Sequence, residues 1–264
     1  MTYPVLPSLF LSHGAPSLVL EDCPARHFLA GLGAAMPRPR AIVVCSAHYE
    51  AAGARIGGAE RPETVHDFGG FPDALYQMTY PALGDPVLAA DIAARLKAAG
   101  INAGIDPERG LDHGIWNPLM LAWPKADVPV LPLSITPSRD LRFHHELGRA
   151  LAPLRHEGIL LIGSGAISHN LGRFFGAVHR LDAPEAAFAR GFADWITERC
   201  KAPDPEVLLN GIDSWPGGRE NHPTDDHILP LLFALGAGGE GARGKRLHRS
   251  TNYAVLPMDV LQFS

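Results

Sequence analysis

The chain has 264 residues, of which 46% are hydrophobic and 19% are charged, and its formal net charge is -5. This length permits a large core, and the ordinary composition excludes a disordered chain, a collagen-like repeat and a coiled coil. The mild acidic excess, without clustered Lys and Arg, argues against a nucleic-acid partner. We therefore expect a globular protein that does not bind nucleic acid.

The sequence gives no signal for a membrane partner. Apolar runs such as Ile159–Ile162 are far shorter than the roughly 20 residues that span a bilayer. The apolar stretch near the N-terminus is interrupted by Pro4, Pro7 and His13, which disfavours a secretory signal. The three cysteines are scattered and form no C-x-x-C pair, so disulfides and thiolate zinc sites are disfavoured. We expect a cytoplasmic protein, and a homo-oligomer is compatible with the sequence.

Short apolar runs predict buried strands, and helical spacing recurs between and after them. Alternating strands and helices predict the α/β class, with a mostly parallel central sheet and helices on both faces. No break in composition divides the chain, so residues 1–264 are expected to form a single domain. The predicted strands are Ser8–Ser12, Ala41–Ser46, Pro129–Ile135 and Gly158–Gly163, and the predicted helices are Pro24–Ala35, Asp85–Ala99, Arg139–Arg155 and Pro184–Cys200.

Two further elements are predicted near the C-terminus. A late helix is expected at about Thr224–Leu235, with Asp225 and Asp226 in its first turn, where the helix dipole favours negative charge. This prediction places His227 in the first turn as well. A closing strand is expected at Tyr253–Phe263, and its proline suggests an edge position.

Histidines follow three of the predicted strands. His13 follows the first strand, His48 follows the second, and His169 follows the fourth after a short loop. Because ligands bind at the carboxyl ends of strands in an open parallel sheet, we expect these side chains to share one crevice. His227 is expected to reach across to the same crevice. Imidazole binds zinc, iron and copper well, so the pattern predicts a metal site.

The chain has 13 histidines, and a lone histidine is more often an ordinary core or surface residue. His66 and His113 fall between the two interpretations because each lies in a loop of unusual composition. His144 is expected on a polar helix face. The ordinary interpretation applies to His27, His144, His145, His156, His179 and His248.

Several familiar motifs are incomplete. His145 and Glu146 begin an H-E-x-x-H motif that ends in Arg149, so its second zinc ligand is absent. Ser164 lacks the outer glycines of a G-x-S-x-G nucleophile turn, and the same stretch lacks the third glycine of a dinucleotide motif. Its glycines are expected to form a tight turn that admits a ligand.

Six short motifs, taken together, resemble those of a known family. The set resembles the class III extradiol ring-cleaving dioxygenases, in particular the subfamily similar to 4,5-DOPA extradiol dioxygenase. The likeness covers nearly the whole chain. It implies a single α/β domain that uses O2 to open the ring of a catechol, DOPA-like or a related diol, to a semialdehyde acid. The motifs, in chain order, are Ser12–Pro16, Ser46–His48, His66–Pro72, Leu111–Gly114, Ser168–Leu171 and His222–His227.

The resemblance also implies roles for individual residues. By motif match, the metal ligands are His13, His48 and His227. His169 is the catalytic acid/base, because a neutral imidazole can take a proton from a catechol near pH 7. The cofactor is one divalent metal ion, either Fe(II) for catalysis or Zn(II) as found in similar proteins. The substrate-binding residues are His113 and His222.

Two alternatives remain open at this point. Three neutral imidazoles with an open position also describe a catalytic zinc site, so a zinc-dependent hydrolase fits the same residues. A non-catalytic metal-binding relative would retain the ligands without turnover. Four aromatic side chains either form the walls of a pocket for a planar ring or pack in the core: Phe68, Phe71, Tyr76 and Trp116.

Overall fold

The computed structural model describes residues 3–176 and 180–264. Within these residues, eight strands form one sheet in the order β4-β3-β5-β2-β6-β1-β10-β7, and two further strands, β8 and β9, form a separate pair. The strands are β1 Ser8–Ser12, β2 Ala41–Glu50, β3 Ala54–Gly57, β4 Ala103–Asp106, β5 Val130–Ile135, β6 Ile159–Gly165, β7 Gly244–His248, β8 Thr251–Asn252, β9 Leu256–Pro257 and β10 Val260–Phe263.

The middle of the sheet is parallel, as predicted. Strands β5, β2, β6 and β1 run in one direction, whereas β3 and β10 lie antiparallel on either side of them. Every residue of β1, β5 and β6 is buried. Such uninterrupted burial is typical of parallel strands that are covered on both faces. The carboxyl ends of β1, β2 and β6 therefore meet at one edge of the sheet.

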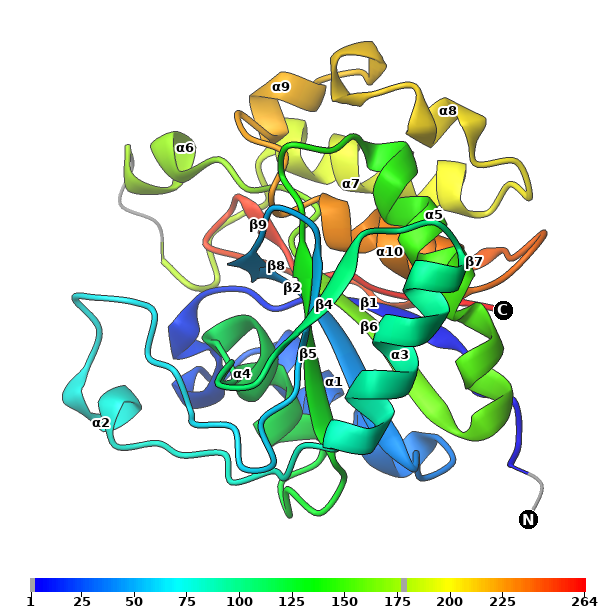
Figure 1. The fold of residues 1–264 in the computed structure, drawn as a ribbon. Helices are drawn as coiled ribbons and strands as arrows, with labels where there is room; N and C mark the ends of the chain where they lie inside the picture. The colour runs from blue at the N-terminus through cyan, green and yellow to red at the C-terminus, as the bar shows by residue number, and fades with distance from the viewer. Residues whose placement is uncertain (1–2, 177–179) are drawn as a thin grey trace.

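Helices cover both faces of the sheet, with α3 and α5 on one side and α1 and α4 on the other (Figure 1). Each face has its own cluster of buried apolar side chains. None of the described helices is long and apolar enough to cross a membrane. The helices are α1 Pro24–Leu32, α2 Asp73–Tyr76, α3 Pro86–Ala98, α4 His113–Ala122, α5 Leu141–Leu151, α6 Leu171–Phe175, α7 Ala187–Cys200, α8 Glu206–Leu209, α9 Gly218–Asn221 and α10 Leu229–Ala237.

The late helix differs from its prediction. Helix α10 begins at Leu229, with Pro230 in its first turn, where a proline is favoured. His227 and Asp226 therefore precede the helix, and Asp226 contacts the His227 ring instead of interacting with the helix dipole. The predicted start was wrong because acidic residues that hold a neighbouring side chain look, in sequence, like acidic residues of a first helical turn.

The predicted closing strand is also wrong in extent and position. Tyr253 and Ala254 adopt positive φ angles of 53° and 62°, a conformation that ends an extended strand. The chain then forms the short β9 and re-enters the sheet as β10. Because β10 lies between β1 and β7, it is an interior strand. Pro257 belongs to the separate two-stranded β8–β9 pair. Proline, which has no backbone N–H, is tolerated on such an edge strand.

Two local predictions need correction. His144 is fully buried rather than on a polar face, because its Nε2 accepts from the Thr136 N–H and its Nδ1 contacts the Asp140 carbonyl. Gly163 and Gly165 lie within β6 and form no ligand-binding turn. A Cβ at Gly163 would collide with the carbonyl of Pro230, and one at Gly165 with the carbonyl of His227. These glycines instead allow the segment that carries His227 to approach the sheet.

A buried ion pair joins α7 to the sheet. Both terminal nitrogens of Arg190 lie 2.9 Å from the carboxylate oxygens of Asp259, whose side chain has no exposed surface. Asp259→Asn should lower the free energy of unfolding by about 3 kcal/mol, because it removes the fully buried counter-charge of Arg190 and leaves only the half-exposed Asp194, 3.1 Å away. Urea unfolding measures this loss.

A matched control is the exposed pair Arg180–Asp182, whose side chains are 82% and 72% exposed. Asp182→Asn should leave the unfolding midpoint unchanged, because solvent screens such a pair. Equal effects of the two substitutions would contradict a stabilising role for the buried pair.

Candidate metal centre

Three imidazole rings converge at the carboxyl edge of the parallel strands. His13 directly follows β1, His48 lies within β2, and His227 lies just before α10. The Nε2 atom of His48 lies 3.2 Å from Nε2 of His13 and 3.3 Å from Nε2 of His227. The sequence analysis predicted these three side chains to share one crevice, and the structure brings them together.

An irregularity in β2 positions His48. The register between β2 and β5 shifts between Ser46 and Glu50, and such irregularities turn a side chain away from the regular alternation. The His48 backbone is held on both sides. Its N–H donates to Ser46 Oγ at 3.2 Å, and its carbonyl accepts from Arg109 at 3.1 Å. Asp112, which is fully buried, accepts from both of these partners.

The hydrogen bonds around Ser164 fix the protonation of the His13 ring. Ser164 Oγ donates its single hydrogen to the Gly114 carbonyl at 2.5 Å. It must therefore accept in its 3.0 Å contact with Nδ1 of His13. The His13 ring then carries its hydrogen on Nδ1, which leaves Nε2 with a free lone pair that faces the other two rings.

Carboxylates lie beside Nδ1 of the other two rings and favour the same tautomer there. Nδ1 of His48 lies 3.4 Å from Asp67 Oδ2, and Nδ1 of His227 contacts Asp226 Oδ2. Burial raises the pKa of Asp67, but hydrogen bonds and charge from His113 outweigh it and lower the pKa to about 2. The pKa of Asp226 is also below its usual value, because the hydrogen bond from His227 outweighs burial. Asp226 thus accepts from Nδ1 of His227, and the ionised Asp67 beside His48 favours the tautomer with its hydrogen on Nδ1, so both Nε2 lone pairs face the cluster.

This donor set fits a divalent metal ion. A tetrahedral ion with bonds of about 2.1 Å holds its nitrogen ligands about 3.4 Å apart. The Nε2 atom of His48 lies at nearly this distance from Nε2 of His13 and of His227. Metal-bound histidines usually donate their second N–H to a carboxylate or another oxygen. His13 and His227 do so here, and Asp67 lies 3.4 Å from Nδ1 of His48. Among the described residues, the site contains no cysteine, since Cys23, Cys45 and Cys200 are buried elsewhere as free thiols.

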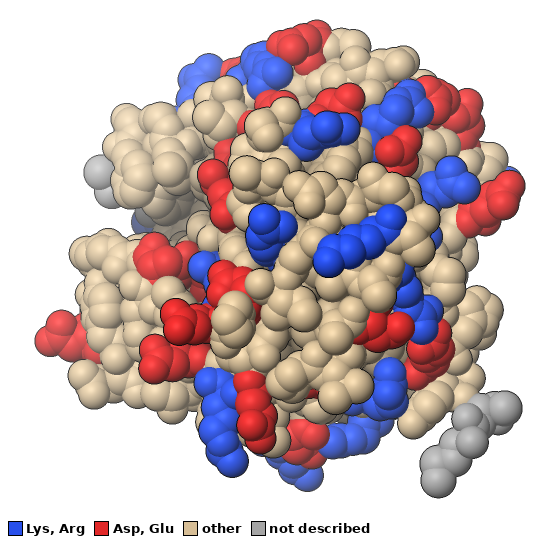
Figure 2. Space-filling model, in the orientation of Figure 1, with Lys and Arg blue, Asp and Glu red and all other residues tan. Residues whose placement is uncertain are grey.

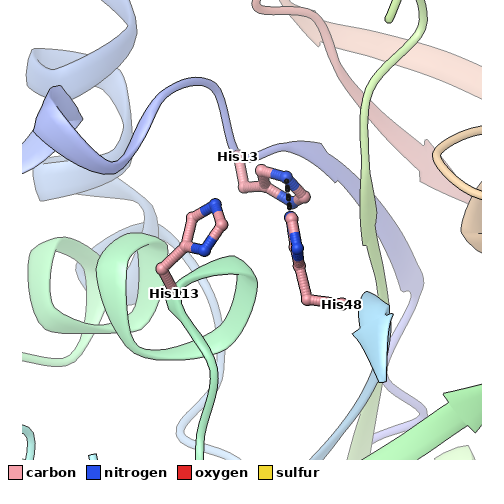
Figure 3. Close-up of side chains that lie close together, drawn as sticks. All are labelled: His13, His48 and His113. Carbon is pink, nitrogen blue, oxygen red and sulfur yellow. Dashed lines mark hydrogen bonds between the residues drawn. The ribbon is translucent and has the colours of Figure 1, made fainter. Parts of the chain in front are cut away.

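A fourth histidine, His113, lies beside this triad. Its Nδ1 and its backbone N–H both lie within 3.0 Å of Asp67 Oδ1, so its Nε2 is also free. Potential ligand atoms of His113 lie within 4.8 Å of those of His13 and His48, and Figure 3 shows the three rings pointing toward one another. His113 begins α4, a helix that the sequence analysis missed because it contains Gly114 and Pro118, which are usually unfavourable in helices.

His169 stacks directly on a ring of the triad. Its ring lies parallel to that of His227, with centroids 3.4 Å apart and an angle of 12° between the planes. Its Nδ1 lies 4.0 Å from Asp226 Oδ2. Burial, assisted by the neighbouring His227, lowers the pKa of His169 to about 3, so the ring is neutral near pH 7. Potential ligand atoms of His169, Asp226 and His227 also lie within 4.8 Å of one another.

His222 lies deeper than the sequence analysis expected. Its side chain is fully buried, its Nε2 contacts the carbonyl of Ile167 at 2.6 Å, and it is not among the residues that line the pocket. This contact joins His222 to the loop that leads to His169. Substrate binding by His222 stays a prediction, and the observed position favours support of that loop.

The rings open onto a cavity of about 360 Å³, a size typical of small-molecule sites. Of the four aromatic residues considered as pocket walls, Phe71 lines this cavity. Trp116 instead packs in the core, where its Nε1 donates to the carbonyl of Val65. The lining consists of five histidines (His13, His48, His113, His169 and His227), Gly14–Pro16, and the apolar side chains of Phe71, Leu171, Phe174, Phe175 and Leu256.

Sequence reasoning missed the residues that orient the rings. Asp67 and Asp226 each stand next to a histidine within motifs that were already singled out, so carboxylate–histidine adjacency was an available signal. Ser164 gave no such signal, because its partner His13 is distant in the chain. Asp112 stands next to His113, but its contact with Ser46 joins residues far apart in the chain. Among the histidines considered ordinary, His179 lies outside the described residues.

Comparison with known proteins decides the family. A family model described as the catalytic LigB subunit of aromatic ring-opening dioxygenase matches residues 8–258. The chain belongs to this family. It is 42% identical over 238 residues to a 4,5-DOPA dioxygenase extradiol of Escherichia coli (strain K12), covering 88% of this chain and 85% of the relative. It is 35% identical over 261 residues to a 4,5-DOPA dioxygenase extradiol of Beta vulgaris, covering 97% and 96%.

A solved structure supports the same assignment. The crystal structure of an uncharacterized protein from Escherichia coli K12 matches this LigB-family chain with a TM-score of 0.81 and 36% identity, covering 97% of this chain and 99% of that one. The predicted family and α/β fold class are confirmed. The chain is an extradiol aromatic ring-opening dioxygenase, an enzyme whose reaction implies an aromatic substrate and O2. The hydrolase and non-catalytic alternatives are not favoured.

The buried neutral histidines make the metal-free dioxygenase sensitive to acid. Mainly through burial, the pKa is lowered to about 4 for His144 and His222 and to about 3 for His169. The unfolded chain therefore takes up more protons once the pH falls below about 6.5. The stability contributed by these rings is present above that pH and is lost below it.

Between pH of about 7.5 and about 5.5, the free energy of unfolding should fall by about 1 kcal/mol for each such ring. Urea unfolding in the presence of a chelator measures the fall. His144→Gln, which retains a hydrogen-bond acceptor and a donor, should reduce this fall in the free energy of unfolding by about 1 kcal/mol. A midpoint that is constant or higher at the lower pH would contradict this account.

Proposed function

We propose that this dioxygenase opens the ring of a catechol beside its hydroxyls, using a divalent metal ion held by His13, His48 and His227. The observation that supports the proposal is the convergence of three Nε2 atoms, each on a ring whose Nδ1 faces an oxygen within 3.4 Å. Bound there, Fe(II) would supply open coordination positions for the diol and O2 and electron transfer between them. Zn(II) fits the same donor set.

The residues around the triad have separate tasks in this proposal. His169, held neutral by burial, accepts a proton from a catechol hydroxyl at its free ring nitrogen and later returns it. Asp226 lies near enough to stabilise the protonated ring while it also orients His227. His113, held by Asp67 with its Nε2 free, accepts a hydrogen bond from the substrate. The apolar walls exclude water from the reacting ring.

The setting of the enzyme is part of the same proposal. We infer a cytoplasmic location from the three unpaired cysteines, because thiols stay reduced in that compartment. Neither a nucleic-acid nor a membrane partner is proposed, given the net charge of -5.

Oxygen uptake tests the proposed reaction. The purified protein is stripped of metal, loaded anaerobically with Fe(II), and mixed with a panel of catechols in an oxygen electrode. O2 consumption that requires both Fe(II) and a catechol, with formation of a yellow ring-opened product, is expected. Absence of uptake with every catechol from fully iron-loaded protein would refute the proposal.

Two substitutions separate metal binding from proton transfer. His48→Ala should abolish metal retention, because it removes the ring that lies next to both other ligands. His169→Ala should retain the metal but lower kcat by about 100-fold or more, the usual contribution of a general acid/base. Metal analysis and steady-state kinetics measure the two effects.

The exposed His27, which pairs with Asp22 at the surface, provides a control. His27→Ala should change neither metal content nor kcat. A His169→Ala enzyme with an undiminished kcat would remove the acid/base role from that residue, and complete metal loss in the same variant would make it a ligand.

A further inference from the structure

The cavity above the metal centre lacks the charged groups that would bind an amino-acid substrate. None of the described residues that line it is Lys, Arg, Asp or Glu, and the sequence contains none at 177–179. The histidines lie together at one part of the lining. The remaining large side chains, which would surround the substituent of a bound catechol, are Phe71, Leu171, Phe174, Phe175 and Leu256.

Charged residues close to this cavity already have partners. Arg173, the cation of α6, donates to Glu220 at 2.6 Å. Glu21, which contacts the cavity wall through Tyr253 and Phe174, accepts hydrogen bonds from Ser17, Tyr253 and Asn252. The carboxylates of Asp67 and Asp226 lie behind the histidines and are bonded to them. No charge is therefore presented to a substituent by these residues.

The α6 side of the cavity rim is apolar as well. Leu171 and Phe175 of α6 are 49% and 76% exposed, although both line the cavity. Figure 2 shows a hollow beside the part of the surface where α6 lies in Figure 1, and that part is formed by uncharged residues on this face. The opposite side of the hollow carries acidic residues, which lie outside the cavity lining. Exposed apolar side chains around a concave site usually mark a surface that binds an apolar ligand.

We infer that the substrate is a neutral catechol with an apolar substituent, rather than an amino-acid, acid or amine catechol. This inference rests on the proposed function. A carboxylate or ammonium group that enters an apolar cavity loses hydration and gains no partner, so binding is weakened. An apolar substituent gains from the same transfer, because it buries its surface against aromatic and leucine side chains. A charged group at the open rim keeps part of its hydration, so we expect discrimination of about tenfold rather than more.

Substrates of matched size test the inference. The Fe(II)-loaded enzyme is assayed with 4-propylcatechol (neutral), dihydrocaffeate (anionic), dopamine (cationic) and L-DOPA (zwitterionic). We expect kcat/KM for 4-propylcatechol to exceed that of each charged compound by about tenfold. Calorimetry of the Zn(II)-loaded protein should give the same order of dissociation constants without turnover. A charged catechol that equals or surpasses 4-propylcatechol in both measurements would overturn the inference and leave the dioxygenase function intact.

Failure of the proposed function looks different from failure of this inference. It would appear as no oxygen uptake with any of the four compounds. Uptake with a preference for a charged compound would overturn only the substrate class.

A substitution at the rim provides a second test. Leu171→Arg places a cation beside the cavity and should shift the ratio of kcat/KM for dihydrocaffeate to that for 4-propylcatechol upward by about tenfold. Val87→Arg, at an exposed apolar position of α3, adds the same charge away from the cavity and should leave the ratio unchanged. If both variants behave like the wild type, the substituent does not contact this wall, and the inference fails.

Discussion

Three unprotonated imidazole nitrogens that face one another in a buried site repel each other unless a cation lies between them. In this structure each ring turns its Nδ1 toward an oxygen behind it: Ser164 for His13, Asp67 for His48 and Asp226 for His227. A tautomer change at any ring would remove a ligand. The proposed metal centre therefore depends as much on these three oxygens as on the histidines themselves.

Several features of the fold bring these histidines together. Parallel pairing of β1, β6 and β2 brings His13 and His48 to one edge of the sheet, and glycines in β6 allow the segment that carries His227 to lie against it. The same segment places Asp226 between His227 and His169. In the proposed reaction, one carboxylate therefore couples ligand orientation to proton transfer. The walls further out are apolar and would contact the substituent of the substrate.

Sequence reasoning predicted the strands that carry the site but not all of the segments that complete it. The continuous apolar runs at Ser8–Ser12 and in β6 predicted buried strands, and the parallel-sheet rule then placed their histidines together. Helix α4 gave no signal because Gly114 and Pro118 hide its helical pattern. The positions of Ser164 and Asp112 depend on contacts between residues far apart in the chain, which no local pattern reports. The depth of His222 likewise follows from packing rather than from its motif.

X-ray absorption spectroscopy of the zinc-loaded protein tests the central claim most directly, since it counts imidazole ligands on the bound ion. Our account predicts a nitrogen- and oxygen-only shell whose multiple scattering fits three imidazoles at about 2.0–2.1 Å, with no sulfur. A shell with one imidazole or none, or one that contains sulfur, would show that the converging rings do not hold the metal.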